Sequence, residues 1–316
     1  MRPLTEDLPK SLLELKEGYT ILDKQLLHFK IAGFKRIYFL AGYLHEKIYE
    51  RFKTSWNGLD IEYLVEEKPG GTLYALNNLF RSTDEDAVVM NGNIVSDFNL
   101  KEMVQHHREA EMLMYVTPLV SPYGVAELSD SKVISFKEKP QLPYYINGGI
   151  YVISNSLREY CSRYEKGDAE KLVFPSIARD GLLRYYREEG VFWQAVGSVK
   201  DLEAVQSEYK NKNDKPWGYE KIIVSTDKYL TKELYIKKGE NTSYHYHEKK
   251  DETLHVFRGE GYVEFEDDQI HLKKNDTLRI QPGTSHSIHA IENLVLNEYS
   301  TPHPEDTMRI RDPYKR

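Results

Sequence analysis

The stretch GENTSYHYHEKKDETLHVFRG, residues 239–259, decides the fold of the C-terminal part of the chain. Its two histidines, His245 and His247, stand two residues apart, and on a β-strand this spacing places both rings on one face. Glu252 follows near the start of the next expected strand, and His286 follows the turn residues QPGTS. Three imidazoles and a carboxylate suit Zn, Fe, Mn, Co or Ni, with positions left for substrate or water. The sequence therefore predicts a divalent metal site at His245, His247, Glu252 and His286.

The segments on either side of that stretch are short, alternate in polarity and are punctuated by Gly, Asn and Asp, which predicts a small β-barrel or sandwich. Seven of the eleven histidines lie after residue 240, which also indicates a metal site in this part of the chain. We expect the remaining four of these seven to be surface or packing residues: His255, His271, His289 and His303. The polar residues 211–216, ending at Pro216, are predicted to be a linker between domains 1–210 and 217–316.

Residues 20–210 alternate between apolar runs rich in strand formers and segments of 10–15 residues with helical spacing. This alternation predicts an α/β domain with a mostly parallel sheet covered on both faces. Between residues 112 and 154 the pattern changes to short strands, which indicates a strand-rich insertion near the sheet edge. Ligands often bind near such edges in open α/β folds.

Composition narrows the function further. The 316 residues carry a net charge of −7, which argues against nucleic acid as the main partner. No apolar run approaches the ~20 residues of a membrane-spanning helix, and the opening MRPLTEDLPK lacks the apolar core of a secretory signal. Cys161 is the single cysteine, so we expect no disulfide and a cytoplasmic location.

The pattern G-x5-H-x-H-x4-E-x6-G in residues 239–259 resembles the first motif of the cupin superfamily. With KPWGYE (215–220) and EDTMRIRDPYKR (305–316), the domain is similar to the C-terminal domain of type II phosphomannose isomerases. The resemblance implies that a metal polarises a sugar oxygen while a base moves a proton between C1 and C2. Family analogy also implies a homodimer. The base stays open, with Glu264 and His255 as guesses only, and the candidate phosphate ligands are Arg309, Arg311 and Arg316.

The opening MRPLTEDLPKSLLEL resembles the sugar-1-phosphate nucleotidyltransferases, and ordered matches such as GGTLYAL, MNGN, SPYGV, ISFKEKP and INGGIYVIS continue to about residue 209. This resemblance implies a Rossmann-like, GT-A-like mixed sheet that binds a hexose phosphate or a nucleotide sugar. The positions that match the family's sugar-phosphate contacts are Lys10, Tyr123, Gly124, Glu138, Lys139, Asn147 and Gly148. Gly71 and Thr72 match positions near the nucleotide.

The family's catalytic residues are replaced in this chain. No glycine-rich GGxGTR precedes Arg2, and Asn93 and Ala195 stand where the family has its two magnesium aspartates. An amide is a weak ligand for a hard cation and alanine provides none, so we expect nucleotidyl transfer to be impaired. One alternative is an active enzyme whose chain begins upstream of Met1, with Mg as cofactor and Asp97 or another carboxylate as ligand. Another is a non-enzymatic sugar-phosphate-binding or scaffold protein.

Overall fold

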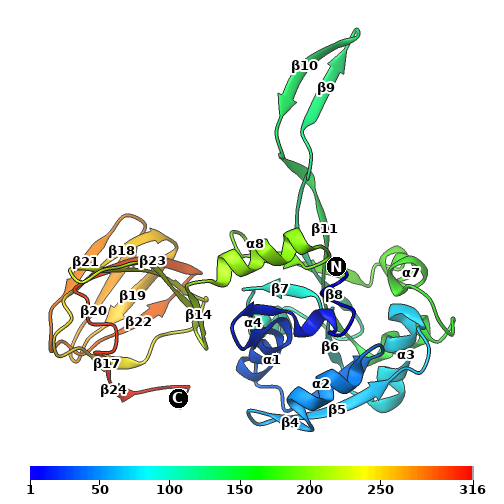
Figure 1. Ribbon diagram of the computed structural model, residues 1–316, viewed down its shortest axis with the longest axis horizontal. Helices are drawn as coiled ribbons and strands as arrows, with labels where there is room; N and C mark the ends of the chain where they lie inside the picture. The colour runs from blue at the N-terminus through cyan, green and yellow to red at the C-terminus, as the bar shows by residue number, and fades with distance from the viewer. Residues whose placement is uncertain (315–316) are drawn as a thin grey trace. The chain divides into compact units, whose positions relative to one another are not determined.

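The computed structural model describes residues 1–314 and separates the chain into two compact units, Met1–Glu203 and Ala204–Arg316 (Figure 1). Each unit has its own hydrophobic core. Helix α8, Val199–Tyr209, crosses the division. Among residues 1–314, no helix is long and apolar enough to cross a membrane.

The first unit is an α/β structure, and its elements follow the predicted alternation closely. Its strands are β1 Glu14–Lys16, β2 Tyr19–Thr20, β3 Arg36–Ala41, β4 Ser55–Trp56, β5 Leu59–Val65, β6 Ala87–Met90, β7 Ile94–Ser96, β8 Met112–Val120, β9 Val125–Ser129, β10 Lys132–Lys137, β11 Gln141–Ile153, β12 Leu183–Tyr186 and β13 Trp193–Ala195. Its helices are the 3-10 turns η1 Lys10–Leu12 and η2 Asn155–Leu157, and α1 Ile21–Ile31, α2 His45–Phe52, α3 Gly71–Ser82, α4 Leu100–Gln105, α5 Arg158–Cys161, α6 Ala169–Leu172 and α7 Phe174–Arg179.

Local chemistry explains where helix α1 begins. The Thr20 side chain accepts a hydrogen bond from the Asp23 amide, and the Asp23 carboxylate accepts one from the Thr20 amide. This reciprocal pair is a capping box, which satisfies two amides that a helix start leaves without partners. Leu22 and Leu26 then lie one turn apart and are buried in the core beside β3.

The sheet of the first unit is mixed, as the resemblance implied, so the prediction of a mostly parallel sheet is wrong. β3 pairs with β5 and β12 with β8 in parallel, but β11 pairs antiparallel with both β6 and β8. The chain returns directly from β8 to β11 through a hairpin rather than through a crossover helix, and hairpin-linked strands run antiparallel.

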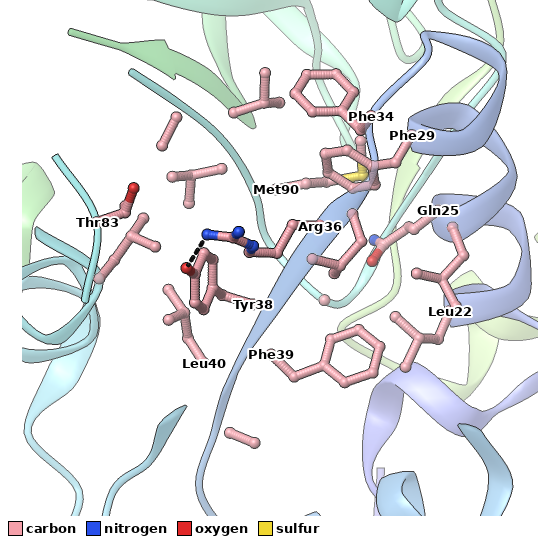
Figure 2. A pocket seen from close by; sticks show the side chains of 18 of the residues that line it. Leu22, Gln25, Phe29, Phe34, Arg36, Tyr38, Phe39, Leu40, Thr83 and Met90 are labelled. Carbon is pink, nitrogen blue, oxygen red and sulfur yellow. Dashed lines mark hydrogen bonds between the residues drawn. The ribbon is translucent and has the colours of Figure 1, made fainter. Parts of the chain in front are cut away.

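The sheet is also divided. The orders β3-β5-β4 and β12-β8-β11-β6 are separate, and within the described residues no strand pairs with the second edge of β3 or of β6. A cavity of about 250 Å³ lies beside these strands and is lined by residues of α1, β3 and β6 (Figure 2). Its walls are largely apolar, including Leu22, Phe29, Phe39, Leu40 and Met90.

The predicted strand-rich insertion is present, but its predicted place near the sheet edge is wrong, because β8 and β11 are the two inner strands of the order β12-β8-β11-β6. β8 and β11 continue past the sheet into a two-stranded arm, and β9 and β10 form its outer hairpin (Figure 1). Because Leu128 pairs with Val133 and Ala126 with Phe136, these side chains lie on one face of the hairpin. All four are exposed.

From Lys212 on, the second unit is an all-β cupin-type barrel. A six-stranded sheet has the order β14-β15-β16-β23-β18-β21, a three-stranded sheet the order β20-β19-β22, and β17 pairs with β24. Inward side chains of the two sheets form one core that includes Leu254, Val263 and Leu296. The strands are β14 Lys212–Lys215, β15 Gly218–Ser225, β16 Leu230–Ile236, β17 Tyr244–Tyr246, β18 Glu252–Arg258, β19 Glu260–Glu264, β20 Gln269–Lys273, β21 Thr277–Ile280, β22 Ser287–Ala290, β23 Leu294–Ser300 and β24 Met308–Arg311.

Strand β14 occupies most of the segment predicted as a linker. It pairs antiparallel with β15. Its polar composition did not indicate a strand, because the side chain that it buries is that of Lys212. The Lys212 ammonium is buried and lies 3.1 Å from a carboxylate oxygen of Glu208. Pairing offsets the cost of burying that charge, so a lysine occupies an inward strand position.

Candidate functional site

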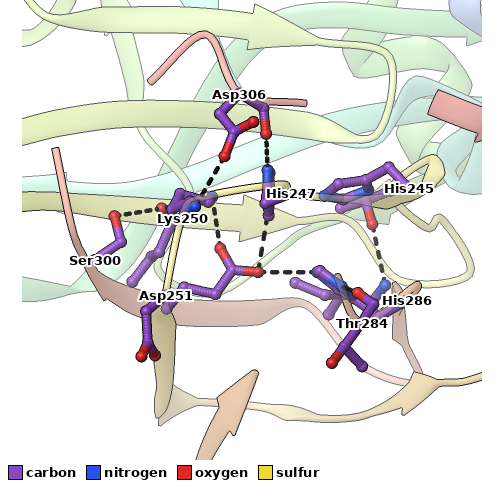
Figure 3. Close-up of polar contacts among 12 residues, drawn as sticks. His245, His247, Lys250, Asp251, Thr284, His286, Ser300 and Asp306 are labelled. Atoms are coloured by element: carbon purple, nitrogen blue, oxygen red, sulfur yellow. Dashed lines mark hydrogen bonds and ion pairs between the residues drawn. The ribbon is translucent and has the colours of Figure 1, made fainter. Parts of the chain in front are cut away.

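Three imidazoles converge in the cupin unit (Figure 3). His245 lies on β17, His247 directly follows that strand, and His286 directly precedes β22. His245 and His286 exchange backbone hydrogen bonds of 2.9 and 2.8 Å, which hold the two segments side by side. One nitrogen of each ring lies within 4.8 Å of the other two. The three predicted histidine ligands therefore come together.

Backbone carbonyls orient all three rings. The Nδ1 of His245 lies 2.7 Å from the Ser243 oxygen, and the Nδ1 of His286 lies 3.0 Å from the Thr284 oxygen. The Nδ1 of His247 contacts the carbonyl oxygen of Asp306. An Nδ1 that donates to a carbonyl leaves Nε2 as a lone-pair donor, which is the usual arrangement around a metal.

The Nε2 atom of His247 is buried and makes no hydrogen bond within residues 1–314. Buried polar atoms are almost always paired, so such an atom indicates a missing partner. Glu252 Oε1 lies 3.7 Å from this nitrogen and 3.0 Å from His286 Nε2. The donor set of three imidazoles and a neighbouring carboxylate fits a divalent metal with open positions.

A buried lysine fixes the other oxygen of Glu252. Lys250 Nζ lies 2.5 Å from Glu252 Oε2 and 3.1 Å from Glu298 Oε1, and Ser300 Oγ donates to the same Glu298 oxygen. The side chains of Lys250, Glu252 and Glu298 are each 3–6% exposed. Lys250 forms an ion pair with both buried carboxylates, and Glu252 Oε1 faces the histidines.

The environment sets the protonation of the site. Burial, followed by the charge of His286, lowers the pKa of His245 to about 3. Burial and then the Lys250 charge also lower the pKa of His247. Burial alone would raise the pKa of Glu252, but its hydrogen bond with His286 and the charge of Lys250 outweigh that effect and lower it. Near neutral pH the ring nitrogens of His245 and His247 and the Glu252 carboxylate are therefore available to a cation.

The three arginines predicted to bind phosphate do not form one group beside the histidines within the described residues. Arg311 lies 2.9 Å from Glu264 Oε1 and stacks on Tyr244, so its charge is already partnered. Arg309 lies on β24 opposite His245 and is exposed. Arg316 lies outside the described residues.

Neither guessed base faces the histidines. Glu264 follows the core residue Val263 on β19, and His255 stands between the core residues Leu254 and Val256 on β18. Alternation along a strand therefore turns Glu264 and His255 to the outside of the barrel.

In the first unit, β7 and β13 bring together the two positions where the resemblance places magnesium aspartates. Ala195 pairs with Ile94, the Val196 amide donates to the Asn93 carbonyl at 2.8 Å, and the Asn93 amide group lies 3.3 Å from the Val196 oxygen. Asp97, the carboxylate suggested as a replacement magnesium ligand, forms a buried ion pair: its Oδ1 lies 2.9 Å from Lys24 Nζ.

The candidate sugar-phosphate residues fall into separate groups. Tyr123, Gly124, Glu138 and Lys139 lie on the arm, where Tyr123 is 76% exposed. Asn147 and Gly148 lie further along β11, where the Asn147 amide donates to the Tyr151 hydroxyl and the Gly148 carbonyl accepts from the Trp193 indole. Asn147 lies six positions further along β11 than Gln141 at the arm, a span of about 20 Å. This conformation does not bring the arm residues to Asn147.

The remaining candidates lie at helix starts. Lys10 begins η1 and is exposed. Gly71 begins α3 with a φ of +79°, and a Cβ there would lie 2.4 Å from the Gly167 carbonyl oxygen, so only glycine fits. Thr72 donates to Glu170 Oε2 at 2.6 Å.

Sequence reasoning missed Lys250, Glu298 and Asp306. Lys250 was visible two residues before Glu252, but a lysine beside a glutamate usually indicates a solvated surface. Its burial depends on Glu298, which is 48 residues away in sequence.

These features define a class of protein: an α/β unit with a GT-A-like mixed sheet joined to a cupin barrel. A family model described as Nucleotidyl transferase matches residues 1–212, and one described as Cupin domain matches residues 233–296. The chain therefore belongs to the nucleotidyl transferase family and carries a cupin domain.

Two curated relatives are similar to the first unit in sequence, and one solved structure is similar to it in fold. D-glycero-alpha-D-manno-heptose 1-phosphate guanylyltransferase of Aneurinibacillus thermoaerophilus is 30% identical over 185 residues, covering 54% of this chain and 76% of the relative. The mannose-1-phosphate guanylyltransferase catalytic subunit beta of Drosophila pseudoobscura pseudoobscura is 32% identical over 214 residues, covering 64% of this chain. The match spans 57% of that relative's length. HddC from Yersinia pseudotuberculosis shares the fold, with a TM-score of 0.52 at 19% identity over 64% of this chain and 91% of that one.

Proposed function

We propose that this chain acts in activated-sugar metabolism in the cytoplasm, as a homodimer whose cupin unit isomerises or epimerises a hexose phosphate. In the same proposal the nucleotidyltransferase-like unit binds a hexose phosphate or nucleotide sugar without efficient nucleotidyl transfer. The observation that carries the proposal is the convergence of His245, His247 and His286, with a buried Nε2 on His247 that makes no hydrogen bond within the described residues. Asn93 and Ala195 occupy adjacent strand segments and neither carries a carboxylate for magnesium, which supports impaired transfer.

His245, His247 and His286 would hold a divalent metal through Nε2, and Glu252 would add Oε1. When bound, the metal supplies Lewis acidity that polarises a sugar oxygen. Lys250 orients the Glu252 carboxylate and keeps it charged in a buried position. The backbone oxygens of Ser243, Thr284 and Asp306 hold the three rings in the tautomer that presents Nε2.

The test incubates the full chain, loaded in turn with Zn, Mn, Fe, Co or Ni, with mannose 6-phosphate or fructose 6-phosphate and follows interconversion by NMR. Turnover that requires metal and disappears in His247→Ala would support the proposal. His271→Ala is the matched control, because His271 is an exposed barrel histidine on β20 outside the metal cluster. Bound metal without turnover on any common hexose phosphate would exclude the isomerase and favour the non-enzymatic binding protein.

A second candidate is an active sugar-1-phosphate nucleotidyltransferase, and the cavity between β3 and β6 favours it. One additional strand between these two unpaired edges would join the divided sheet, and the apolar lining suits an apolar strand. Ser11 and Gly92 line the same cavity, and Asn93 follows Gly92 directly. Such a strand would therefore run close to the position of the first magnesium aspartate. A chain that begins upstream of Met1 would supply it.

Reading the codons upstream of Met1 and assaying the extended chain distinguishes the two candidates. Magnesium-dependent pyrophosphate release from GTP and mannose 1-phosphate by the extended chain would establish the transferase. Asp97→Asn separates the two roles of that carboxylate: loss of stability alone would assign it to the ion pair with Lys24, whereas loss of the magnesium dependence would make it a metal ligand. An extended, folded chain that releases no pyrophosphate would leave the impaired unit as the better description.

A further inference from the structure

The loop that carries His247 is held from the C-terminal segment by one residue, Asp306. The Asp306 carboxylate accepts hydrogen bonds from three consecutive amides: Glu248 at 3.2 Å, Lys249 at 2.6 Å and Lys250 at 2.8 Å. Its backbone carbonyl accepts the Nδ1 proton of His247 (Figure 3). One residue therefore contacts four successive positions of the loop between β17 and β18.

The C-terminal segment that contains Asp306 also holds β17, the strand that carries His245. β24 pairs antiparallel with β17, placing Arg309 opposite His245 and Met308 opposite Tyr246. The backbone of residues 306–311 thus fixes both His245 and His247, and these two residues come from the His-x-His motif whose rings must point to one centre. Asp306 is 56 residues from Lys250 in sequence.

We propose that Asp306 is a positioning residue of the metal centre: it holds the 247–250 loop and sets the His247 ring so that Nε2 faces the metal. The inference rests on the proposed metal centre and goes beyond it, because it assigns the C-terminal segment to the site. An oriented, hydrogen-bonded histidine pays less ordering cost on binding a metal, and loss of such a partner typically weakens metal affinity by roughly 10–100-fold.

Loop order can be separated from metal binding. In Asp306→Ala the three amides lose their acceptor, while the Nδ1 contact of His247 is to a backbone oxygen that the substitution retains. The loop is then held by one contact in place of four. Amides 248–250 should exchange hydrogen faster in the metal-free chain. Asp306→Asn keeps one carbonyl acceptor in the same place and should give an intermediate result.

The experiment uses the full chain, stripped of metal, with Co²⁺ as the probe. We expect the Co²⁺ dissociation constant to rise roughly 10-fold in Asp306→Ala, the lower end of that range, because the loop is freed but the His247 ring keeps its carbonyl partner. The visible spectrum of bound Co²⁺ should change with the ligand geometry. Glu305→Ala is the matched control, because Glu305 is its exposed neighbour on the same segment and should leave both readouts unchanged. Circular dichroism and thermal unfolding of the metal-free variants check the fold. If Asp306→Ala does not fold, Asp306→Asn carries the test.

The outcomes separate this inference from the proposed function. Metal bound by the wild type and equally well by the folded Asp306 variants, with an unchanged Co²⁺ spectrum, overturns the positioning role and leaves the metal centre standing. A lower melting temperature with unchanged Co²⁺ affinity and spectrum also overturns it, because the role is then only structural. A wild-type chain that takes up no Co²⁺, Zn²⁺ or Mn²⁺ overturns the metal centre itself.

Discussion

Replacing Lys250 with methionine should destabilise the cupin unit strongly at neutral pH. The lysine ammonium lies between two carboxylates, 2.5 Å from Glu252 Oε2 and 3.1 Å from Glu298 Oε1, and all three side chains are almost fully buried. Methionine approximately matches the length and volume of the lysine stem, so the substitution removes the charge with little change in packing. Two buried carboxylates would then lack their common cation.

Removing one partner of a buried ion pair costs about 3–5 kcal/mol, and we expect a loss in this range. This is a large share of the ~5–15 kcal/mol that stabilises a typical domain. The loss should shrink as the pH falls. In the wild type the pKa of Glu252 is lowered, so its contribution is present above the unfolded value near 4.3 and is lost as the pH falls through the folded value. In the variant a buried carboxylate can take up a proton in place of its lost cation, so lowering the pH reduces the unfolding free energy of the variant less than that of the wild type.

The assay is hydrogen exchange by mass spectrometry in increasing urea, read from the peptides that cover β18 and β23. This measurement reports the cupin unit alone, since a two-domain chain does not unfold in one step. The second variant is Lys250→Met combined with Glu298→Gln, which should recover about 1 kcal/mol or more because only one unpaired carboxylate remains. A loss below about 1 kcal/mol at pH 7, or no recovery in the double variant, would refute the reasoning.

Three further predictions concern pH, backbone geometry and magnesium. The metal-free cupin unit should lose stability as the pH falls from 6.5 toward 3, because folding lowers the pKa of His245 to about 3. The loss should reach up to about 1.4 kcal/mol for each pH unit. Urea titrations at pH 7, 6 and 5 should show this slope, and a flat profile contradicts it. Gly218→Ala should cost about 3 kcal/mol by the same exchange assay, since its Cβ would lie 1.9 Å from the Tyr235 carbonyl oxygen; an unchanged unfolding free energy would count against that clash. Asn93→Asp combined with Ala195→Asp should create Mg²⁺ binding measurable by calorimetry, because β7 and β13 already bring these positions together; no heat above wild type would show that they do not converge on one ion.

Much of the fold could be read from local sequence. The two-residue spacing of His245 and His247 predicts that both rings lie on one face, and the alternation of apolar runs with helical spacing in residues 20–210 predicts the α/β unit. Such features depend on residues close together in sequence, so they can be predicted without knowing which distant segments they contact.

Two features depended on partners remote in sequence. Lys250 looks like a surface lysine until Glu298, 48 residues away, is placed against it. Lys212 has a partner only four residues earlier, Glu208, but β14 looked like a linker because its residues are polar. The direction of the strands was wrong for a related reason, because periodicity shows that strands exist but does not show whether β8 and β11 meet as a hairpin.

By itself, the sequence determined the identity of the metal-ligand candidates, the two fold classes and the replacement of two magnesium aspartates by Asn93 and Ala195. Only the tertiary structure decided which polar groups became buried. The Asp306 carboxylate accepts hydrogen bonds from the loop that follows His247, and Asp97 pairs with Lys24. Tyr123 lies on the arm, away from Asn147. The physical reason is that residue types set what a side chain can bind, whereas burial and pairing depend on which distant segments lie within a few ångströms of it.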